Sequence, residues 1–320
     1  MTEFDEMKLF LKQASLFLAL FLIPCGVMEV LLRQPAMDSY AAKHYLLETH
    51  THDTEVLILG SSLSWAGLIS ERIHPKSINV GNYEQSFYYD LQILRKYAPR
   101  MPRLKVVILP LSYGSCFTRP SPRQEHLYSI YWDIEPYSGN FSFDNYSAVI
   151  AFGFWNSLKK IWRREERFSL ANRGWGSILE AYDGSEATAR RRFNYLKGFM
   201  GANHYEEATG YVEEIVRTCL EKGIRPIVFL PPYAPQFNAL LEGDPQWAQV
   251  LAFAEKLERE FGLEVYDFND NERFPTHFFR DPDHLNILGA EVLSHLMHLV
   301  VAKNMTAAEL KQVRYQPPGQ

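Results

Sequence analysis

The chain has 320 residues, is poor in cysteine and carries no strong excess of charge of either sign. Its three cysteines make no disulfide framework, because Cys25 lies in an apolar run and leaves only Cys116 and Cys219 as a pair. A formal net charge of -5 gives no field for holding nucleic-acid phosphates, and zinc-finger spacings and RNA-binding aromatic motifs are missing from the sequence. Nucleic acid is therefore not an expected partner.

Low-complexity segments are also missing, and the composition is that of a folded protein. Hydrophobic residues make up 47% of the chain and aromatic residues 14%. A chain of this length and composition can bury a full α/β core, either as one large domain or as one domain with an insertion.

An almost unbroken apolar run extends from residue 14 to residue 28 and continues past Glu29 to residue 32. Its length approaches the ~20 residues that a helix needs to cross a bilayer. Lys8 and Lys12 precede the run, and basic residues favour the cytoplasmic side. We expect residues 1–34 to form a cytoplasmic N-terminus and a single transmembrane anchor. The remainder would be extracytoplasmic, in a bacterial periplasm or at a cell surface.

The same segment has three alternative interpretations, and each fits the sequence less well than an anchor. A buried core helix would need a solvent-facing polar stripe, which the run lacks. A cleaved secretory signal would need a small-x-small cleavage site after the run, and residues 29–35 contain none. A lipidation site at Cys25 is a poor fit because Pro24 precedes it. The carboxylate of Glu29 can reach the headgroup region from the outer end of the helix or bind a helix partner.

After a predicted polar linker over residues 35–54, short apolar runs alternate with amphipathic stretches, which is typical of βαβ units. Strands are expected at 55–60, 77–81, 104–110, 225–230 and 263–267. Helices are expected at 85–97, 211–222, 247–261 and 286–302. The pattern predicts an α/β fold over residues 55–305: a three-layer, doubly wound, flavodoxin-like domain with five parallel strands and a tail at 306–320.

The alternation fails between about residues 112 and 208, so we expect a mostly helical insertion after the third strand. The segment is crowded with aromatic residues, which could form the core of a small subdomain or line a lid or groove for sugars or a membrane partner. Basic residues lie beside Trp155 and Trp162 and indicate either a solvated helix face or contact with an anionic bilayer. They are Lys159, Lys160, Arg163, Arg164 and Arg167.

A Gly60-Ser61-Ser62 turn directly follows the first predicted strand. Reacting groups of doubly wound sheets collect at the carboxyl ends of strands, and backbone N–H groups at the start of a following helix can hold an oxyanion. Ser62 is therefore a candidate nucleophile. Serines also cap helices routinely, so this turn alone is weak support.

The downstream segment Asp281-Pro-Asp-His284 precedes the last predicted helix. Asp281 and His284 would face the same way on a helical turn, so that the carboxylate orients an imidazole that activates a serine. We expect Asp281 rather than Asp283 in this role, because adjacent side chains diverge. The structural alternative is Asp281 or Asp283 as a helix cap with His284 exposed.

Together the two segments resemble the SGNH (GDSL-like) hydrolase family. Gly60-Ser61-Ser62 matches the family's first block, usually Gly-Asp-Ser, and Asp281-x-x-His284 matches its last block. The resemblance spans about residues 55 to 302. It implies Ser62 as nucleophile, His284 as general base and then general acid, and Asp281 as the orienting carboxylate.

Two further blocks of the family are altered here. The second block is met by residues 79–84, where Glu84 replaces the final glycine, although its backbone N–H can still donate. The third block, usually Gly-x-Asn-Asp, is absent. The oxyanion hole would then consist of the N–H groups of Ser62 and Glu84, with Asn82 or Ser112 replacing the missing amide.

The anchor and the altered third block resemble SGNH proteins that work with membrane-bound O-acyltransferases on cell-surface polymers. This resemblance implies a membrane-anchored acyltransferase or esterase acting on O-acyl groups of extracytoplasmic glycans, with acetyl as the expected group and such an acyltransferase as a partner. The alternatives are a plain carboxylic ester hydrolase and a non-catalytic SGNH-like partner or glycan-binding subunit. No cofactor is expected, and His277 near His284 lacks the companions of a metal site.

Overall fold

The computed structural model describes residues 3–163, 172–176, 179–200 and 204–313. Five parallel strands form one sheet in the order β2-β1-β3-β4-β5. Their bounds are Val56–Ile58 (β1), Ser77–Asn79 (β2), Val106–Pro110 (β3), Arg225–Leu230 (β4) and Val265–Asp267 (β5). This is the strand order of the flavodoxin-like doubly wound fold, and the predicted α/β class is confirmed.

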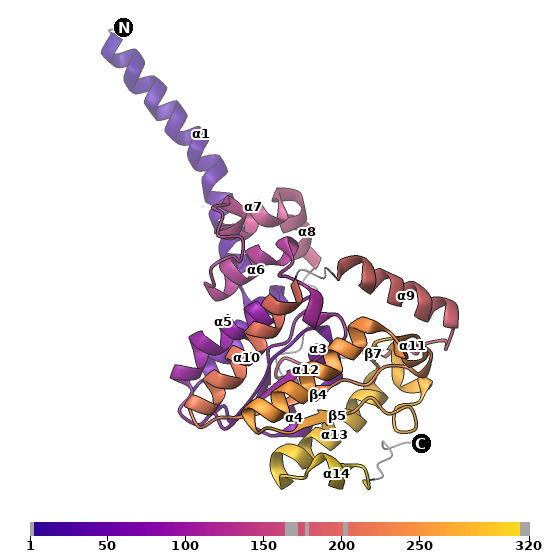
Figure 1. Ribbon diagram of the computed structural model, residues 1–320. Helices are drawn as coiled ribbons and strands as arrows, with labels where there is room; N and C mark the ends of the chain where they lie inside the picture. Colours follow the sequence, from indigo (N-terminus) through magenta and orange to yellow (C-terminus); the bar gives the residue numbers. More distant parts are fainter. Residues whose placement is uncertain (1–2, 164–171, 177–178, 201–203, 314–320) are drawn as a thin grey trace.

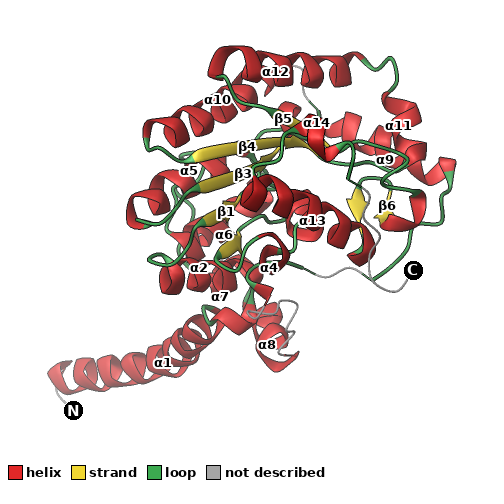
Figure 2. Ribbon diagram, turned by 90° about the horizontal axis from the view of Figure 1, so that it is seen from below, coloured by secondary structure: helices red, strands yellow, loops and turns green. Residues whose placement is uncertain are grey.

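Side chains alternate across the sheet and build a core on each face. Leu57 of β1 belongs to the cluster under α5 (Phe87–Tyr97), α10 (Tyr205–Glu221) and α12 (Pro245–Phe261). Ile58 belongs to the cluster under α13 (Ile287–Lys303) on the opposite face. Figure 2 shows the sheet between α10 and α12 on one side and α13 on the other. The three predicted layers are therefore present.

The predicted linker is a packed helix. Residues 39–50 form α2 (Ser39–His50), whose N-cap Asp38 accepts a hydrogen bond from the N–H of Tyr40. Tyr40, Leu46 and Leu47 are buried in the same core cluster as α5. The linker prediction was wrong because the polar residues of the segment conceal an apolar face at helical spacing.

The N-terminal helix α1 (Glu3–Leu32) is continuous, and its segment Phe4–Leu32 is long and apolar enough to cross a membrane. Most of its side chains are exposed, but Met28 and Leu32 are buried in the domain core. Figure 1 shows α1 projecting from the body, with only its C-terminal end packed. The anchor boundary predicted at residue 34 therefore cuts through the packed region.

In the part of the chain that the structure describes between β3 and β4, every element is helical, as predicted. The helices before α10 are η3 (Ser115–Phe117), α6 (Pro122–Trp132), η4 (Phe143–Asn145), α7 (Ala148–Phe152), α8 (Phe154–Arg163) and α9 (Glu186–Phe199). Helices α7 and α8 pack beside the end of α1, and α9 packs on α11 (Pro235–Leu241). Arg164 and Arg167 lie outside the described residues.

Short elements complete the structure. They are η1 (Pro35–Met37), α3 (Ser62–Gly67), α4 (Ser70–Ile73), η2 (Ala98–Arg100), η7 (Thr276–Phe278), β6 (Phe279–Asp281), β7 (His284–Leu285) and α14 (Ala307–Leu310). Leu310 of α14 is buried, so the predicted tail at 306–320 begins with a packed turn. Residues 314–320 of that tail lie outside the described residues.

Candidate active site

The nucleophile candidate Ser62 is the first residue of α3 and lies just beyond the carboxyl end of β1. Gly60 makes this sharp turn possible, because its φ of +109° lies in the region that favours glycine. A Cβ at Gly60 would also lie 2.5 Å from the ring of Pro110 on β3. Since the first N–H groups of a helix have no intrahelical acceptor, those at the start of α3 are suited to hold an anion.

The loop after β2 packs tightly beneath the nucleophile turn. Asn79 donates from its amide to the carbonyls of Ser64 (2.7 Å) and Leu68 (2.9 Å) of the α3 region. A Cβ at Gly81 would lie 2.9 Å from the carbonyl oxygen of Gly60. The second sequence block thus fixes the nucleophile turn through Asn79 and Gly81.

His284 brings the two distant segments together. Its Nε2 lies 2.8 Å from Ser62 Oγ, and its Nδ1 lies 2.9 and 3.1 Å from the two carboxylate oxygens of Asp281. These distances are those of direct hydrogen bonds from nucleophile to base and from base to carboxylate. The three residues therefore have the arrangement of a serine–histidine–aspartate triad.

The local backbone differs from the predicted helical turn. Asp281 ends β6 and His284 begins β7, and the two strands pair antiparallel. The Asp281 carboxylate also accepts from the backbone N–H of His284 (2.9 Å) and of Asp283 (3.2 Å), which fixes its orientation. The i, i+3 spacing fits a tight strand turn as well as a helix, and here the turn is formed.

Asp283 approaches the same imidazole instead of diverging from it. Its carboxylate lies 3.4 Å from His284 Nδ1, farther than that of Asp281. Asp283 also accepts a bidentate pair from Arg192 of α9, with Nε–Oδ1 at 2.7 Å and Nη2–Oδ2 at 2.8 Å. Such a fork-shaped pair holds both groups rigidly, so the insertion is fastened directly behind the base. Arg192 was not predicted, since no local signal in the sequence connects residues 91 positions apart.

Two carboxylates control the protonation of the base. Burial alone lowers the pKa of His284, but the charges of Asp283 and Asp281 and their hydrogen bonds outweigh it and raise this pKa to about 9. The pKa of Asp283 is opposed by burial but lies well below its usual range, because His284 and Arg192 stabilise the carboxylate. The site therefore stabilises the imidazolium that forms when His284 takes a proton.

The predicted oxyanion donors have distinct environments. The amide of Asn82 donates to the Val80 carbonyl and to Gln85, both at 3.2 Å. Ser112, at the end of β3, shares a 2.8 Å hydrogen bond with Ser115. Glu84 is exposed and has a left-handed backbone with φ of +53°. Asn82 and Ser112 would have to exchange these bonds to face a substrate, and all four oxyanion roles, including that of the Ser62 N–H, stay predictions.

A buried polar chain that the sequence did not reveal supports the nucleophile turn. The carboxylate of Asp90 on α5 accepts from the Gly60 N–H (2.7 Å) and from Gln85 Nε2 (2.6 Å). On the other side of the loop, Lys43 of α2 donates to the Gly81 carbonyl and to Asn82 Oδ1. Burial raises the pKa of Asp90 to about 7 and places that of Lys43 well below its usual range. Helix α5 thereby holds the turn that carries Ser62, and α2 holds the neighbouring loop after β2.

Aromatic side chains flank the turn. The rings of Trp65 and Tyr83 lie 4.6 Å apart between centroids, and Tyr83 is exposed. The insertion closes over α3 where Trp175 donates its indole N–H to the Ala66 carbonyl (2.8 Å). This pair of rings, which the sequence analysis did not single out, offers apolar contact to a substrate beside Ser62.

The carboxylates and imidazole also have the donor chemistry of a metal site. One atom from each of Asp281, Asp283 and His284 lies within 4.8 Å of the others. Each of these atoms already takes part in the bonds to Ser62, Arg192 or its neighbours in the turn, and Arg192 brings a positive charge to the carboxylates. The donor set therefore fits a proton-transfer site better than a cation site.

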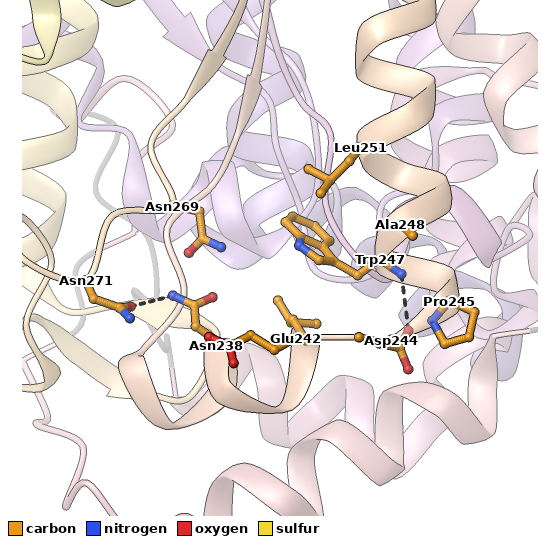
Figure 3. A pocket seen from close by; sticks show the side chains of 11 residues that line it. Asn238, Glu242, Asp244, Pro245, Trp247, Ala248, Leu251, Asn269 and Asn271 are labelled. Atoms are coloured by element: carbon orange, nitrogen blue, oxygen red, sulfur yellow. Dashed lines mark hydrogen bonds between the residues drawn. The ribbon is translucent and has the colours of Figure 1, made fainter.

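A separate surface pocket lies between the end of α11 and the start of α12 (Figure 3). Trp247, Asn238 and Asn269 contribute to its lining, and Asn238 donates to Asn271 (2.6 Å). Neither Ser62 nor His284 is among its lining residues. The reacting groups thus lie in a different part of the surface.

No family model matches the sequence, and no curated protein matches it either. Among solved structures, a GDSL-like lipase from Bacteroides thetaiotaomicron is 10% identical, with a TM-score of 0.43 over 84% of this chain and 100% of that chain. A proposed acylhydrolase from Bacteroides fragilis is 11% identical, with a TM-score of 0.40 over 78% of this chain and 88% of that chain. Similarity at this level carries no information on the activity of the present chain.

Proposed function

We propose that the chain is an SGNH-type serine enzyme that transfers or hydrolyses ester-linked acyl groups. The observation that carries the proposal is the continuous hydrogen-bonded series from Ser62 Oγ through the His284 imidazole to Asp281. A serine hydroxyl is a weak nucleophile at neutral pH, and a hydrogen-bonded, oriented imidazole is what activates it.

The geometry supports a two-step reaction. His284 Nε2 takes the Ser62 proton while Oγ attacks the ester carbonyl, and the imidazolium then returns that proton to the leaving alcohol. The acyl group is now bound to Ser62. In the second step an acceptor hydroxyl attacks the acyl carbon, His284 takes its proton and Ser62 leaves with it. Asp281 holds the ring and stabilises its charge in both steps.

The acceptor decides between the enzymatic alternatives. Water gives an esterase, and a sugar hydroxyl gives an O-acyltransferase. We favour transfer of a short acyl group, such as acetyl, to an extracytoplasmic glycan, with the chain anchored by α1 and a membrane-bound O-acyltransferase as acyl source. The apolar length of α1 and the rings of Trp65 and Tyr83 beside Ser62 support this choice.

The test uses the full-length protein in detergent, a fluorophosphonate probe and a p-nitrophenyl acetate assay. We expect covalent labelling of the wild type, and loss of labelling and turnover in Ser62→Ala. Ser61→Ala is the matched control, because it removes the neighbouring hydroxyl and leaves the series intact. Labelling that persists in Ser62→Ala would overturn the proposal. Product masses with and without an acetyl-accepting oligosaccharide then distinguish transfer from hydrolysis.

A further inference from the structure

Five aromatic side chains between residues 141 and 162 are more than half exposed. They are Phe141, Phe143, Tyr146, Trp155 and Trp162, here called the aromatic collar. Trp155 is 72% exposed and Trp162 is 90% exposed, which is unusual for the largest apolar side chain. The rings of Phe141 and Tyr146 are stacked at 5.4 Å, and Phe143 meets Phe141 edge-on at 5.1 Å. Grouped exposed rings of this kind mark an interaction surface.

The aromatic collar lies where α1 leaves the domain. Near the end of α1, the Glu29 carboxylate accepts from the N–H groups of Ala148 and Val149 on α7, both at 3.1 Å. Arg33 donates to the Tyr146 carbonyl (2.9 Å) and pairs with Glu29 (2.6 Å). Figure 1 shows α7 and α8 beside this end of α1. The exposed rings therefore continue the apolar surface of α1 onto the catalytic body.

Helix α8 has the composition of a helix that lies in a membrane surface. Trp155, Leu158 and Trp162 follow at spacings of three and four, which places them on one side of the helix, and all three are exposed. Ser157 is buried on this helix, which packs against α1 and α7, and Lys159 is exposed. Tryptophan next to lysine is typical of the boundary between lipid headgroups and acyl chains.

We infer that the aromatic collar rests in the headgroup and acyl boundary of the same bilayer that α1 enters, and that lipid is its occupant. The inference rests on the proposed membrane anchor and extends it to a second contact. Lipid is favoured over a sugar ligand because the collar adjoins α1, whereas α9 is the helix of the insertion that binds Asp283 beside the triad, through Arg192. The contact would fix the orientation of the catalytic domain on the membrane.

The experiment uses full-length protein in vesicles of phosphatidylcholine and phosphatidylglycerol whose acyl chains carry bromine, which quenches nearby tryptophan. Trp155 and Trp162 are two of the six tryptophans, so we expect about one third of the emission to be quenched if the yields are similar. The variant Trp155→Phe/Trp162→Phe keeps the rings apolar and should lose this quenching. Acrylamide, a quencher in the aqueous phase, should not reach Trp155 and Trp162 in the vesicles.

The matched control places one tryptophan at an exposed site outside the collar. Leu220→Trp on α10, made in the double phenylalanine background, should respond to acrylamide and not to brominated lipid. Equal lipid quenching in the wild type and the double variant would overturn the inference. So would acrylamide access to Trp155 and Trp162 in the vesicles, an outcome that would point to a protein occupant.

An alkaline carbonate wash of the same vesicles separates the two levels of the proposal. Loss of the protein in the wash would refute the anchor, and the collar contact with it. Retention of the protein without lipid quenching of the collar would refute the collar contact alone. Neither result bears on labelling of Ser62, which tests the chemistry independently.

Discussion

The triad region and the aromatic collar depart from ordinary burial in opposite directions. At the triad, charged groups such as Asp283 and His284 are buried and bonded to one another, although such groups are normally left in water. At the collar, indole rings that are normally buried are exposed. Each departure costs free energy unless a partner offsets it: hydrogen bonds and charge at the triad, and another surface at the collar. Both therefore point to function, but to different kinds.

In the triad region, we expect substitution of Asp281 to cause the largest loss of activity. Asp281→Asn replaces the carboxylate that accepts directly from His284 Nδ1 and orients the ring, and turnover should fall on the order of 10⁴-fold, as expected for a triad carboxylate. Asp283→Asn should cost much less, because Asp283 is the more distant carboxylate. The measurement is the rate of ester turnover by both full-length variants. A larger loss for Asp283→Asn would exchange the roles of the two residues.

Near the collar, two N-terminal deletions test how much the packed end of α1 contributes to the stability of the domain. Deleting residues 1–24 should leave a stable domain, whereas deleting residues 1–34 also removes the buried side chains of Met28 and Leu32. Burial of two such side chains contributes about 3 to 6 kcal/mol, so the shorter protein should unfold at a markedly lower temperature. Thermal unfolding followed by circular dichroism compares the two. Equal stability would mean that α1 contributes nothing beyond anchoring.

The buried carboxyl of Asp90, beneath the nucleophile turn, should make the stability of the triad region depend on pH. The pKa of Asp90 is raised by burial from 3.8 to about 7, so the folded protein holds this proton more tightly than the unfolded chain does. The resulting stabilisation is present at low pH and declines as pH rises from about 4 to about 7, by at most about 1.4 kcal/mol per pH unit. Asp90→Asn should flatten this decline in urea unfolding titrations. If the free energy of unfolding declined with pH equally steeply in the variant, the decline would not come from Asp90.

The smallest expected effect concerns the pair behind the base. His284 must be neutral to accept the serine proton, so activity should increase with pH as the imidazolium, with a pKa of about 9, loses its proton. Asp283→Asn removes the negative charge that contributes most to raising this pKa. The acid limb of the pH–activity curve should therefore shift to lower pH by about one pH unit. Arg192→Gln leaves Asp283 unpaired beside His284 and should shift it upward. Shifts of the same sign in both variants would contradict this account.

The sequence predicts the features that have local signals, but not those that depend on tertiary packing. The five strands and the segments carrying Ser62 and His284 were found because apolar runs and a turn motif are local signals. Lys43 in α2 could not be found in this way, because lysine is almost never buried and its partner Asn82 lies 39 residues away. The Arg192–Asp283 pair is likewise a product of tertiary packing. The Asp281–His284 turn was assigned to a helix because both conformations bring residues three apart together.

The junction between α1 and the domain has a mechanical consequence. Because Leu32 is buried and Arg33 bonds to the body at Ile130 and Tyr146, no flexible tether separates the two. With α1 inserted, the domain would be attached rigidly to the membrane helix. It could not move freely above the bilayer, as an enzyme on a flexible linker can. Ser62 would then stand at one height over the bilayer, and any polymer to be modified would have to be threaded past that height. A thicker or thinner bilayer would move the height itself.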